Sequence, residues 1–560
     1  MTKRGVIVRR LEAIENLGSA DILCTDKTGT LTKGVVELTG AVDIDGEPSE
    51  RVFQYAVTNS RLETGIDNPL DAAIVAAAYR RGFAAADPAK IDEIPYDFIR
   101  KRLTIVVAEG EGAKTHLIVT KGAFDTVIAC CEHVAVASQT VPLDAALRQK
   151  LDDYYRTKGG EGFRVLGLAT KSVTAKERYD RGDETGMVFE GFLLFFDPLK
   201  DGIETTVSEL ERLGVSVKIV TGDNRHVAMH VGAAVGLDPS RTLTGQELNE
   251  TREEALWHLA EQTDLFAEVD PQQKERIVRA LQHRGHCVAY LGDGINDAPA
   301  LQAADAGVSV DQAVDVARET ADIVLLERDL GVLKDGIVDG RRTFVNTMKY
   351  VSIATSANFG NMISMAFATL FVPFLPLLAK QILLNNFLSD FPSVAISTDN
   401  VDPGAVDQAR RWNIREIQIF MLVFGFISTA FDFLTFALLL GFFHAGEALF
   451  QTTWFVVSVL TQLAALLVLR TRLPCWKSRP STLLIVSTVM IAAVAISLPY
   501  LGSVARAFGF VPPPLPLLLS GFVIVMLYIC ATELGKQRFY RKMTGGKGID
   551  AGRDASMPSR

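Results

Sequence analysis

The pattern of apolar and polar residues divides the 560-residue chain into two parts. Up to about residue 340, short apolar runs alternate with polar stretches. Beyond that point the apolar runs are long, each near the ~20 residues that a helix needs to cross a bilayer. Six candidate spans are expected, at 349–371, 377–397, 417–441, 450–469, 481–502 and 512–533. The chain is therefore predicted to consist of a soluble part followed by a membrane part.

Within the soluble part, strand-length apolar runs alternate with helical patterns. The runs predicted to be short parallel strands are 216–220, 287–291, 306–310 and 323–326. This alternation is typical of a doubly wound α/β sheet. The run 20–24 is expected to join the same sheet. The segment 35–195, which mixes strand-like and helical patterns, is then an insertion after the first strand and turn.

The distribution of lysine and arginine predicts the orientation in the membrane. The loops at 409–415 and 470–479 are basic, as is the tail from Lys536, whereas the intervening loops hold only Lys380 and Arg506. Basic loops face the cytoplasm. We therefore expect a multi-pass protein of the cell membrane, with the soluble part and the C-terminus cytoplasmic. The tail 541–560 has the composition of a disordered segment.

Composition excludes several other classes of protein. The net charge of −9 gives no indication of nucleic-acid binding. The six cysteines include no Cys-x-x-Cys pair, so buried free thiols are expected rather than disulfides or a zinc site. The N-terminus has no apolar stretch of the kind found in signal peptides.

The run Asp26-Lys27-Thr28-Gly29-Thr30-Leu31-Thr32 is the most informative motif. It follows a predicted strand, and open α/β sheets place their chemistry at the carboxyl ends of strands. The small residues and the glycine allow a phosphate to approach backbone N–H groups. A carboxylate in this position can act as a nucleophile and form an aspartyl-phosphate.

Three further motifs follow predicted strands or begin a helix. Val217–Asp223 ends in Thr221, Gly222 and Asp223, although alone it is also typical of a plain turn. Phe266–Lys274 places Lys274 at the start of a helix, where it can neutralise phosphoryl charge or simply face solvent. In Gly292–Leu301, Asp293 and Asp297 lie on a glycine-rich turn, a pattern that suits Mg²⁺ held partly by water and phosphate.

The inserted segment contains a weaker candidate for nucleotide binding. Thr120-Lys121-Gly122-Ala123 could contact a nucleotide, and Phe98 could stack on an adenine next to the basic residues 100–102. A core aromatic beside a basic surface strand is nearly as good an interpretation of Phe98.

Taken together and in this order, the motifs resemble those of the P-type ATPases across nearly the whole chain. The resemblance implies a haloacid-dehalogenase-like phosphorylation domain (1–34 and 196–335), an inserted α+β nucleotide-binding domain (35–195) and a membrane domain of six helices (336–540). It implies ATP and Mg²⁺ as cofactors and Asp197–Lys200 as the hinge between the soluble domains. The residues to which it gives roles are Asp26 as phosphoryl acceptor; Thr28, Thr221, Lys274 and Asn296 around the phosphoryl group; Asp26, Thr28 and Asp293 for Mg²⁺; Asp297 as support of that loop; and Phe98, Lys121, Gly122, Arg164, Thr221, Gly222 and Asp223 for the nucleotide.

The first two candidate spans resemble the bacterial magnesium-transporting branch of this family. They imply Asn358, Asn361, Asn386, Ser389 and Asp390 as candidates for the transported ion, with Asp432 in the third span as a further one. One carboxylate among amide and hydroxyl groups suits a cation that keeps several waters, although such groups also join helices by hydrogen bonds. The run 385–393 departs from the pattern of that branch, which leaves Ca²⁺ and H⁺ as alternatives.

The resemblance also implies that a complete pump has about 300 further residues before Met1, with four spans and the actuator domain, possibly on a separate chain. Thr28 stands where soluble hydrolases of this type carry a second Asp as general acid–base. We therefore expect this chain to bind ATP and form the phosphoenzyme, but to turn over slowly and not to transport alone. Two rivals of another class are a membrane-anchored phosphatase and a non-enzymatic pump fragment.

Overall fold

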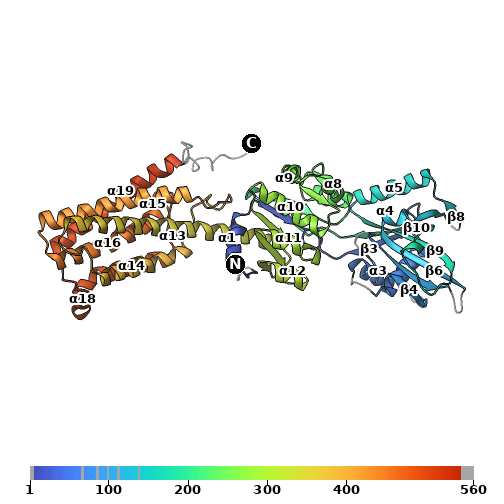
Figure 1. Cartoon of the computed structure of the whole chain (residues 1–560), viewed down its shortest axis with the longest axis horizontal. Helices are drawn as coiled ribbons and strands as arrows, with labels where there is room; N and C mark the ends of the chain where they lie inside the picture. The colour runs from blue at the N-terminus through green and yellow to red at the C-terminus, as the bar shows by residue number, and fades with distance from the viewer. Residues whose placement is uncertain are drawn as a thin grey trace, which may run out of the picture. The chain divides into compact units, whose positions relative to one another are not determined.

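The computed structural model describes residues 5–64, 68–83, 88–97, 100–109, 114–136 and 139–543. The chain forms two compact units, Met1–Gly336 and Ile337–Arg560, and each is considered by itself (Figure 1).

The first unit contains a predominantly parallel sheet with the strand order β1-β16-β15-β14-β2-β11-β13-β12. Only the edge strand β1 is antiparallel to its neighbour. The strands are β1 (Val6–Val8), β2 (Ile22–Thr25), β11 (Ser216–Val220), β12 (Thr242–Thr244), β13 (Leu265–Ala267), β14 (Val288–Leu291), β15 (Ala306–Val310) and β16 (Ile323–Leu325). The strand expected at 20–24 is β2, and it lies near the centre of the sheet between β14 and β11.

Helices accompany these strands along the chain. They are α1 (Glu12–Ser19), α6 (Ile203–Arg212), α7 (Arg225–Ala234), α8 (Gly245–Glu250), α9 (Glu253–Gln262), α10 (Pro271–His283), α11 (Ala298–Ala303) and α12 (Asp315–Thr320), with the 3₁₀ turn η3 (Ile295–Asp297) before α11. The start of α10 is strongly defined, because Asp270 and Gln273 form a capping box and Pro271 occupies the first turn.

A second sheet is built from residues between Glu37 and Phe196. Its strand order is β4-β5-β6-β9-β10-β7-β8, and β3 pairs with β10. The strands are β3 (Glu37–Val42), β4 (Lys90–Ile94), β5 (Arg102–Ala108), β6 (Thr115–Ala123), β7 (Cys131–Val136), β8 (Gln139–Pro142), β9 (Arg164–Thr174) and β10 (Met187–Phe196). The pairings are antiparallel except that of β10 with β7.

Alternation along the strands gives this sheet two apolar faces. On β6, Ile118 packs with α4 (Phe124–Ile128) and α5 (Ala145–Gly160), whereas the next residue, Val119, packs with α2 (Glu50–Leu62) and α3 (Pro69–Arg80). Figure 1 shows α3 and α5 on opposite sides of this sheet. The inserted segment therefore has its own double-faced core.

Two short chain segments connect the sheets. Thr32 pairs with Leu199, the N–H of Lys33 donates to Pro198, and the N–H of Lys200 donates to Leu31. The carboxylate of Asp197 accepts hydrogen bonds from Thr32 Oγ1 at 2.6 Å and from the N–H of Gly34 at 3.0 Å. The expected hinge 197–200 thus lies in the second of two paired connections.

The second unit is helical. Its helices are α13 (Leu330–Phe371, which begins in the first unit), α14 (Ala379–Val394), α15 (Ile414–Ala437), α16 (Glu447–Leu469), α17 (Thr482–Ser497), α18 (Gly502–Phe508) and α19 (Leu515–Met543). Trp454, Phe455 and Val459 of α16 are buried in the apolar core of this helical unit.

Among the described residues, four helical stretches are long and apolar enough to cross a membrane: Ile414–Phe442, Glu447–Leu469, Thr482–Tyr500 and Leu515–Met543. The other two expected spans fall on α13 and α14 and are not among them. The polar residues Asn358 and Asn361 interrupt the apolar run of α13, and α14 has only 16 residues, including Asn385 and Asp390. The chain is therefore a mixed α/β soluble part followed by a membrane part with four clearly apolar helices.

Candidate active site

Asp26 directly follows β2, the strand on which the connections of the sheet change direction. Its N–H donates to the carbonyl of Leu291, the last residue of the neighbouring strand β14. The ends of β11 and β14 therefore flank Asp26 on either side. Loops that follow neighbouring parallel strands meet at the carboxyl edge of a sheet, which brings together motifs far apart in sequence.

The turn after Asp26 is compact. The carbonyl of Lys27 accepts hydrogen bonds from the N–H groups of Leu31 and Thr32 at 3.0 and 3.3 Å. Gly29 has φ +73°, a left-handed conformation that favours glycine. Thr28, at the tip of this turn, is half-buried. Thr28 thus lies in a tight turn directly after Asp26, whose carboxylate accepts a hydrogen bond from the N–H of Lys27 at 2.6 Å.

Lys274 joins the Asp26 and Asp293 loops. Its Nζ lies 2.8 Å from a carboxylate oxygen of Asp26 and 2.8 Å from one of Asp297. Burial lowers the pKa of Lys274, but the two carboxylates more than offset it, so its pKa lies above the ordinary value. The ammonium group is therefore a fixed positive charge next to Asp26, and not the solvated surface lysine that the motif alone would also allow.

Asp297 organises the loop after β14. It is almost fully buried, and it accepts hydrogen bonds from Tyr290 Oη at 2.8 Å and from the N–H groups of Asp293 and Gly294 at 3.2 and 3.1 Å. A Cβ on Gly292 would lie 2.5 Å from the Cβ of Asp297, so glycine is needed there. Asp297 therefore ties the loop after β14 to Lys274.

Asp293 lies at the open side of the same loop. Burial raises the pKa of its carboxyl to about 6, although the Arg328 guanidinium, 3.1 Å away, acts to lower it. Asn296, on the same turn, is exposed. Arg328 was not predicted; it follows β16, and no local pattern distinguishes it from a surface arginine.

Thr221 and Asp223 follow β11. Thr221 is buried, and its Oγ1 accepts a hydrogen bond from the N–H of Asp223 at 3.2 Å. Asp223 forms ion pairs with Lys27 at 2.5 Å and with Arg164 at 3.1 Å. Burial alone would raise the pKa of Asp223, but Lys27 and Arg164 lower it to about 2. Asp223 and Gly222 therefore lie at this edge of the sheet, where Asp223 is the centre of a charge cluster and Lys27 is a member that the sequence did not indicate.

Several residues of the inserted segment were expected to hold a nucleotide. Of those that the structure describes, Arg164 is the one that reaches the edge of the first sheet around Asp26. A cavity of about 80 Å³ is lined by Thr28, Lys27 and Arg164, together with residues of β10 and α3 and the hinge residue Asp197. This cavity connects the turn that carries Asp26 with the start of β9.

Lys121 and Gly122 lie elsewhere, inside the second sheet. Lys121 is buried, forms an ion pair with Asp71 and donates to Ser60 Oγ at 2.8 Å. A Cβ on Gly122 would lie 2.4 Å from the carbonyl oxygen of Lys101, so glycine allows the neighbouring strand to pack closely. In this structure both residues have packing roles. Phe98 lies outside the described residues.

The two carboxylates at the sheet edge fit a magnesium ion. Asp26 and Asp293 follow adjacent strands, and Mg²⁺ characteristically takes one or two carboxylates and completes its shell with water and phosphate. The described residues contain no group of three or more His, Cys, Asp or Glu that could hold a metal ion by themselves. Asp26 and Asp293 would supply two carboxylates to such an ion, and water and phosphate would complete its shell.

The polar residues expected to bind a transported ion lie on α13 and α14. Asn386 and Asp390, one helical turn apart, are both exposed on α14, and Ser389 is half-buried. On α13, Asn358 is exposed and Asn361 is half-buried. Asp432 of α15, in contrast, is buried and accepts hydrogen bonds from Ser364 Oγ at 2.6 Å and Trp454 Nε1 at 2.9 Å. Through these two hydrogen bonds, Asp432 links α15 to α13 and to α16.

Two parts of the chain match models of known protein families. Residues 50–202 match a family model described as "P-type ATPase, cytoplasmic domain N", and residues 374–538 match "Cation transporting ATPase, C-terminus". With an aspartate at a central strand end, a lysine paired with it and a helical membrane part, the chain belongs to the P-type ATPases.

Within this family the chain is similar to the bacterial magnesium-transporting branch. It is 44% identical over 508 residues to "Magnesium-transporting ATPase, P-type 1" of Escherichia coli (strain K12), covering 89% of this chain and 56% of that protein. A Salmonella typhimurium (strain LT2) protein of the same name is 42% identical over 550 residues, covering 97% and 61%. "Calcium-transporting ATPase 1" of Lactococcus lactis is 29% identical over 434 residues, covering 73% and 49%. The chain spans 56–61% of the length of these magnesium-transporting relatives.

Proposed function

We propose that this chain carries the phosphorylation, nucleotide-binding and C-terminal membrane parts of an ATP-driven magnesium transporter. The observation that supports this most directly is the Lys274 ammonium group, which lies 2.8 Å from both Asp26 and Asp297. It places a fixed positive charge where an aspartate would accept a phosphoryl group. The similarity to proteins named magnesium-transporting ATPases supports the choice of ion.

The proposed domains follow the two sheets. Residues 1–34 and 196–335 are assigned to a haloacid-dehalogenase-like phosphorylation domain, and residues 35–195 to the nucleotide-binding domain. Residues 336–540 are assigned to a membrane domain of six spans. The C-terminal part of α13 and the whole of α14 supply two spans in addition to the four apolar helices. We place the protein in the cell membrane with its soluble domains and C-terminus in the cytoplasm, because the loops at 409–415 and 470–479 are basic.

In the proposed reaction, a carboxylate oxygen of Asp26 attacks the γ-phosphorus of ATP. The bond from that phosphorus to the bridging oxygen breaks, ADP leaves, and Asp26 carries an acyl phosphate. Lys274 stabilises the negative charge of the transferring group. Thr28, Thr221 and Asn296 are assigned as hydrogen-bond donors to the transferring phosphoryl group. Asp26, Thr28 and Asp293 would hold Mg²⁺, which when bound would neutralise further phosphoryl charge.

Nucleotide binding is assigned to the side of the cavity that faces β9. Arg164 is half-exposed and lines this cavity, so its guanidinium can leave the ion pair with Asp223 and bind a phosphate of the nucleotide instead. Gly222 and Asp223 are assigned to the same nucleotide site. For Lys121 to contact the nucleotide directly, its Nζ must first leave its ion pair with Asp71. Gly122 is assigned an indirect role in the nucleotide site, because it allows β5 and β6 to pack closely. Phe98 remains our candidate for stacking on the adenine.

The transported ion is assigned to the polar faces of α13 and α14. Asn386 and Asp390 share one exposed face of α14, which supports a ligand set of one carboxylate with amides and a hydroxyl. Asn358, Asn361 and Ser389 are the other candidates. Mg²⁺ dehydrates reluctantly, so few protein ligands suffice. Calcium transport is less favoured, because identity to a calcium-transporting relative is 29%.

Labelling with ATP tests the proposal. The purified chain in detergent is incubated with γ-labelled ATP and Mg²⁺, quenched in acid and analysed for bound label. We expect acid-stable label that hydroxylamine removes and that Asp26→Asn abolishes, with Asp201→Asn, an exposed residue, as the matched control. A folded chain that takes up no label but hydrolyses small phosphoesters without ATP would instead be the membrane-anchored phosphatase.

A further inference from the structure

The carboxylates on the Asp26 and Asp293 loops have two different cations as partners. Lys274 Nζ lies 2.8 Å from Asp26 and 2.8 Å from Asp297. The partner of Asp293 is Arg328, whose Nη1 lies 3.1 Å from Oδ2 of that carboxylate. Since Asp293 is also the residue to which we assign Mg²⁺, the guanidinium of Arg328 lies at the carboxylate that the ion would use.

Arg328 is held against the turn that follows Asp26. Lys200 Nζ, from the hinge, donates to the carbonyl of Gly29 at 2.7 Å and also to the carbonyl of Arg328. A Cβ on Gly29 would lie 2.7 Å from Arg328 Nη1 and 3.2 Å from Asp293 Oδ2. A larger residue at position 29 would therefore collide with the guanidinium. The glycine leaves room for Arg328, which makes this arginine part of the site around Asp26.

The contact between Arg328 and Asp293 is of a kind that opens easily. One nitrogen contacts one oxygen, and the two side chains are 33% and 23% exposed. In the second sheet, by comparison, Nη1 of Arg100 contacts both oxygens of the fully buried Glu184 at 2.7 and 2.6 Å. Single contacts that are partly exposed to water stabilise a protein little, whereas buried contacts to both oxygens are much stronger.

The other nitrogen atoms of Arg328 add little to hold it in place. Nη2 donates to the carbonyl of Gln312 at 3.2 Å. Nε is buried and donates to no described residue. A buried donor without an acceptor is costly. The present position of the side chain therefore carries a cost that a movement of the guanidinium can relieve.

The space beside the pair does not admit an ion with its waters. Asp293, Arg328 and Gly292 are among the residues that line a cavity of about 10 Å³, which is roughly the room that one water molecule needs. Mg²⁺ demands octahedral geometry and keeps several waters. An ion on the other side of the carboxylate would still lie close to the guanidinium, and like charges at short distance repel. Arg328 and Mg²⁺ therefore exclude each other at Asp293.

We propose that Arg328 is a competitor of Mg²⁺ for Asp293. Its guanidinium neutralises the carboxylate while the ion is absent, and leaves the carboxylate when the ion binds. This inference rests on the proposed function, and it means that Arg328 sets the Mg²⁺ concentration that the reaction at Asp26 requires. Arg328 is a positioning residue, because it acts through Asp293. Removal of a competitor strengthens metal binding, whereas removal of a mere support of the loop weakens it.

The test measures metal binding without ATP. Mn²⁺ replaces Mg²⁺, because it takes the same oxygen ligands and its unbound fraction is measured by electron paramagnetic resonance. The purified full chain in detergent is titrated with Mn²⁺, and Asp293→Asn gives the background of other sites. We expect Arg328→Gln to bind Mn²⁺ about tenfold more tightly than the unmodified chain, since the ion no longer displaces a charged group. Arg328→Lys keeps a positive charge and should stay within about twofold of the unmodified chain.

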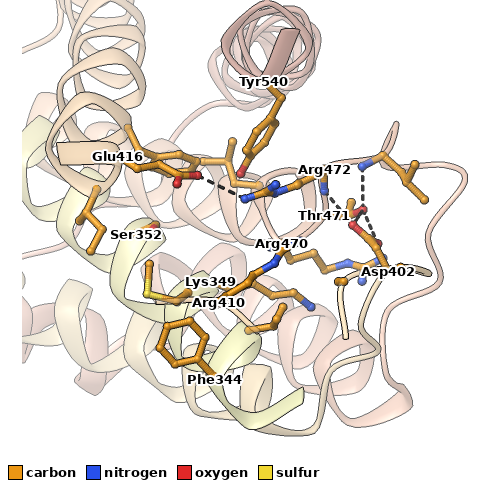
Figure 2. A pocket seen from close by; sticks show the side chains of 18 of the residues that line it. Phe344, Lys349, Ser352, Asp402, Arg410, Glu416, Arg470, Thr471, Arg472 and Tyr540 are labelled. Carbon is orange, nitrogen blue, oxygen red and sulfur yellow. Dashed lines mark hydrogen bonds and ion pairs between the residues drawn. The ribbon is translucent and has the colours of Figure 1, made fainter. Parts of the chain in front are cut away.

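Arg472→Gln is the matched control. Arg472 pairs with Glu416 at 3.3 Å, and the two side chains are 44% and 30% exposed. As Figure 2 shows, this pair lies at a cavity of the helical unit, which has a volume of about 290 Å³. The variant removes the same charge from a similar ion pair, and it should bind Mn²⁺ as the unmodified chain does.

Labelling with γ-labelled ATP gives a second measurement. The Mg²⁺ concentration for half-maximal label should fall in Arg328→Gln by the same factor as the Mn²⁺ affinity rises. Arg328→Met, which keeps the aliphatic part of the side chain, replaces Arg328→Gln if that variant does not fold. Mn²⁺ binding that is equal or weaker in these folded variants overturns the proposal, whether or not label forms. Tighter Mn²⁺ binding without label in any form supports the role of Arg328 and contradicts only the proposed function.

Discussion

At the scale of single residues, the partners of each charge decide what the sheet edge around Asp26 can do. Lys274 is held between two carboxylates, and Asp223 between two cations. Thr28, in contrast, places a hydroxyl two residues after Asp26, where a carboxylate could activate water. An acyl phosphate formed on Asp26 should therefore be long-lived in this chain.

Replacing Thr28 tests this interpretation. Thr28→Asp supplies a base next to Asp26, and the label transferred from ATP should then be lost about 100-fold faster, a typical effect of general base catalysis. The decay of labelled protein after a chase with unlabelled ATP measures this rate. Thr28→Asn, which has the same shape without the base, should decay at the unmodified rate. Equal decay in both variants would contradict the role of position 28.

The buried carboxylate of Asp297 gives a second prediction. Asp297→Ala leaves Tyr290 Oη, two N–H groups and one contact of Lys274 without an acceptor. Breaking a buried charged network of this kind costs about 3 kcal/mol or more in the free energy of unfolding. We expect a lower unfolding midpoint of the soluble part in urea and loss of labelling. Asp315→Ala, whose side chain is 82% exposed, should change neither.

At the scale of elements, strand pairing brings charged residues of the second sheet together. Glu184 is fully buried beside β5 and accepts hydrogen bonds from Arg100 at 2.6 Å, from Arg102 at 2.9 Å and from Thr104 at 2.6 Å. Arg102 and Thr104 lie two residues apart on β5, so their side chains point to the same face. The strand therefore presents two donors to one carboxylate.

This cluster predicts a pH dependence of stability. Burial alone would raise the pKa of Glu184, but its hydrogen bonds with Arg100, Thr104 and Arg102 lower it below the ordinary value. Its folded-state pKa thus lies below the value of about 4.3 in the unfolded chain. The stability that Glu184 contributes is present above that pH and is lost as the pH falls through the folded-state pKa.

Glu184→Gln should therefore destabilise the chain at pH 7 and weaken the decline of Tm on acidification. Thermal unfolding at several pH values between 7 and 3 measures both effects. Glu177→Gln, an exposed glutamate in the same region, is the control and should retain the unmodified profile. An unchanged profile in Glu184→Gln would show that other carboxylates determine the acid limit.

At the scale of the whole molecule, the membrane helices set the sidedness of the protein. Four helices are clearly apolar, and α13 and α14 would make six. Either number is even, so the soluble part and the C-terminus should lie on the same side of the membrane. The basic loops at 409–415 and 470–479 favour the cytoplasmic side.

Reporter fusions test this topology. A reporter active only in the cytoplasm should be active when joined before residue 5 or after residue 543, and inactive when inserted in the loop at 443–446. Insertion at 474–477, in the next loop, is the matched control and should be active. Opposite activities of the two terminal fusions would require an odd number of spans.

Much of the fold and the core of the site could be predicted from local patterns. Alternation of strand and helix patterns indicated the doubly wound sheet, and β2, β11 and β14 lie where short apolar runs were expected. The motifs after these strands predicted that Asp26, Thr221 and Asp293 lie together, and they do, because the carboxyl ends of parallel strands meet at one edge. The six spans were predicted by length, but the polar residues of α13 and α14 reduce the clearly apolar helices to four.

By itself, the sequence determined the family, the motif Asp26–Thr32 and the division into soluble and membrane parts, because these depend on spacing and on runs of apolar residues. Only the tertiary structure decided the partners of each charge. It placed Arg328 beside Asp293, joined Lys27 to Asp223, and buried Lys121 against Asp71 instead of opening it to a nucleotide. It also gathered five cations from three separate segments around one cavity. The physical reason is that ion pairs and cavities form between residues distant in sequence, and their distances are set by strand order and helix packing, which local patterns do not contain.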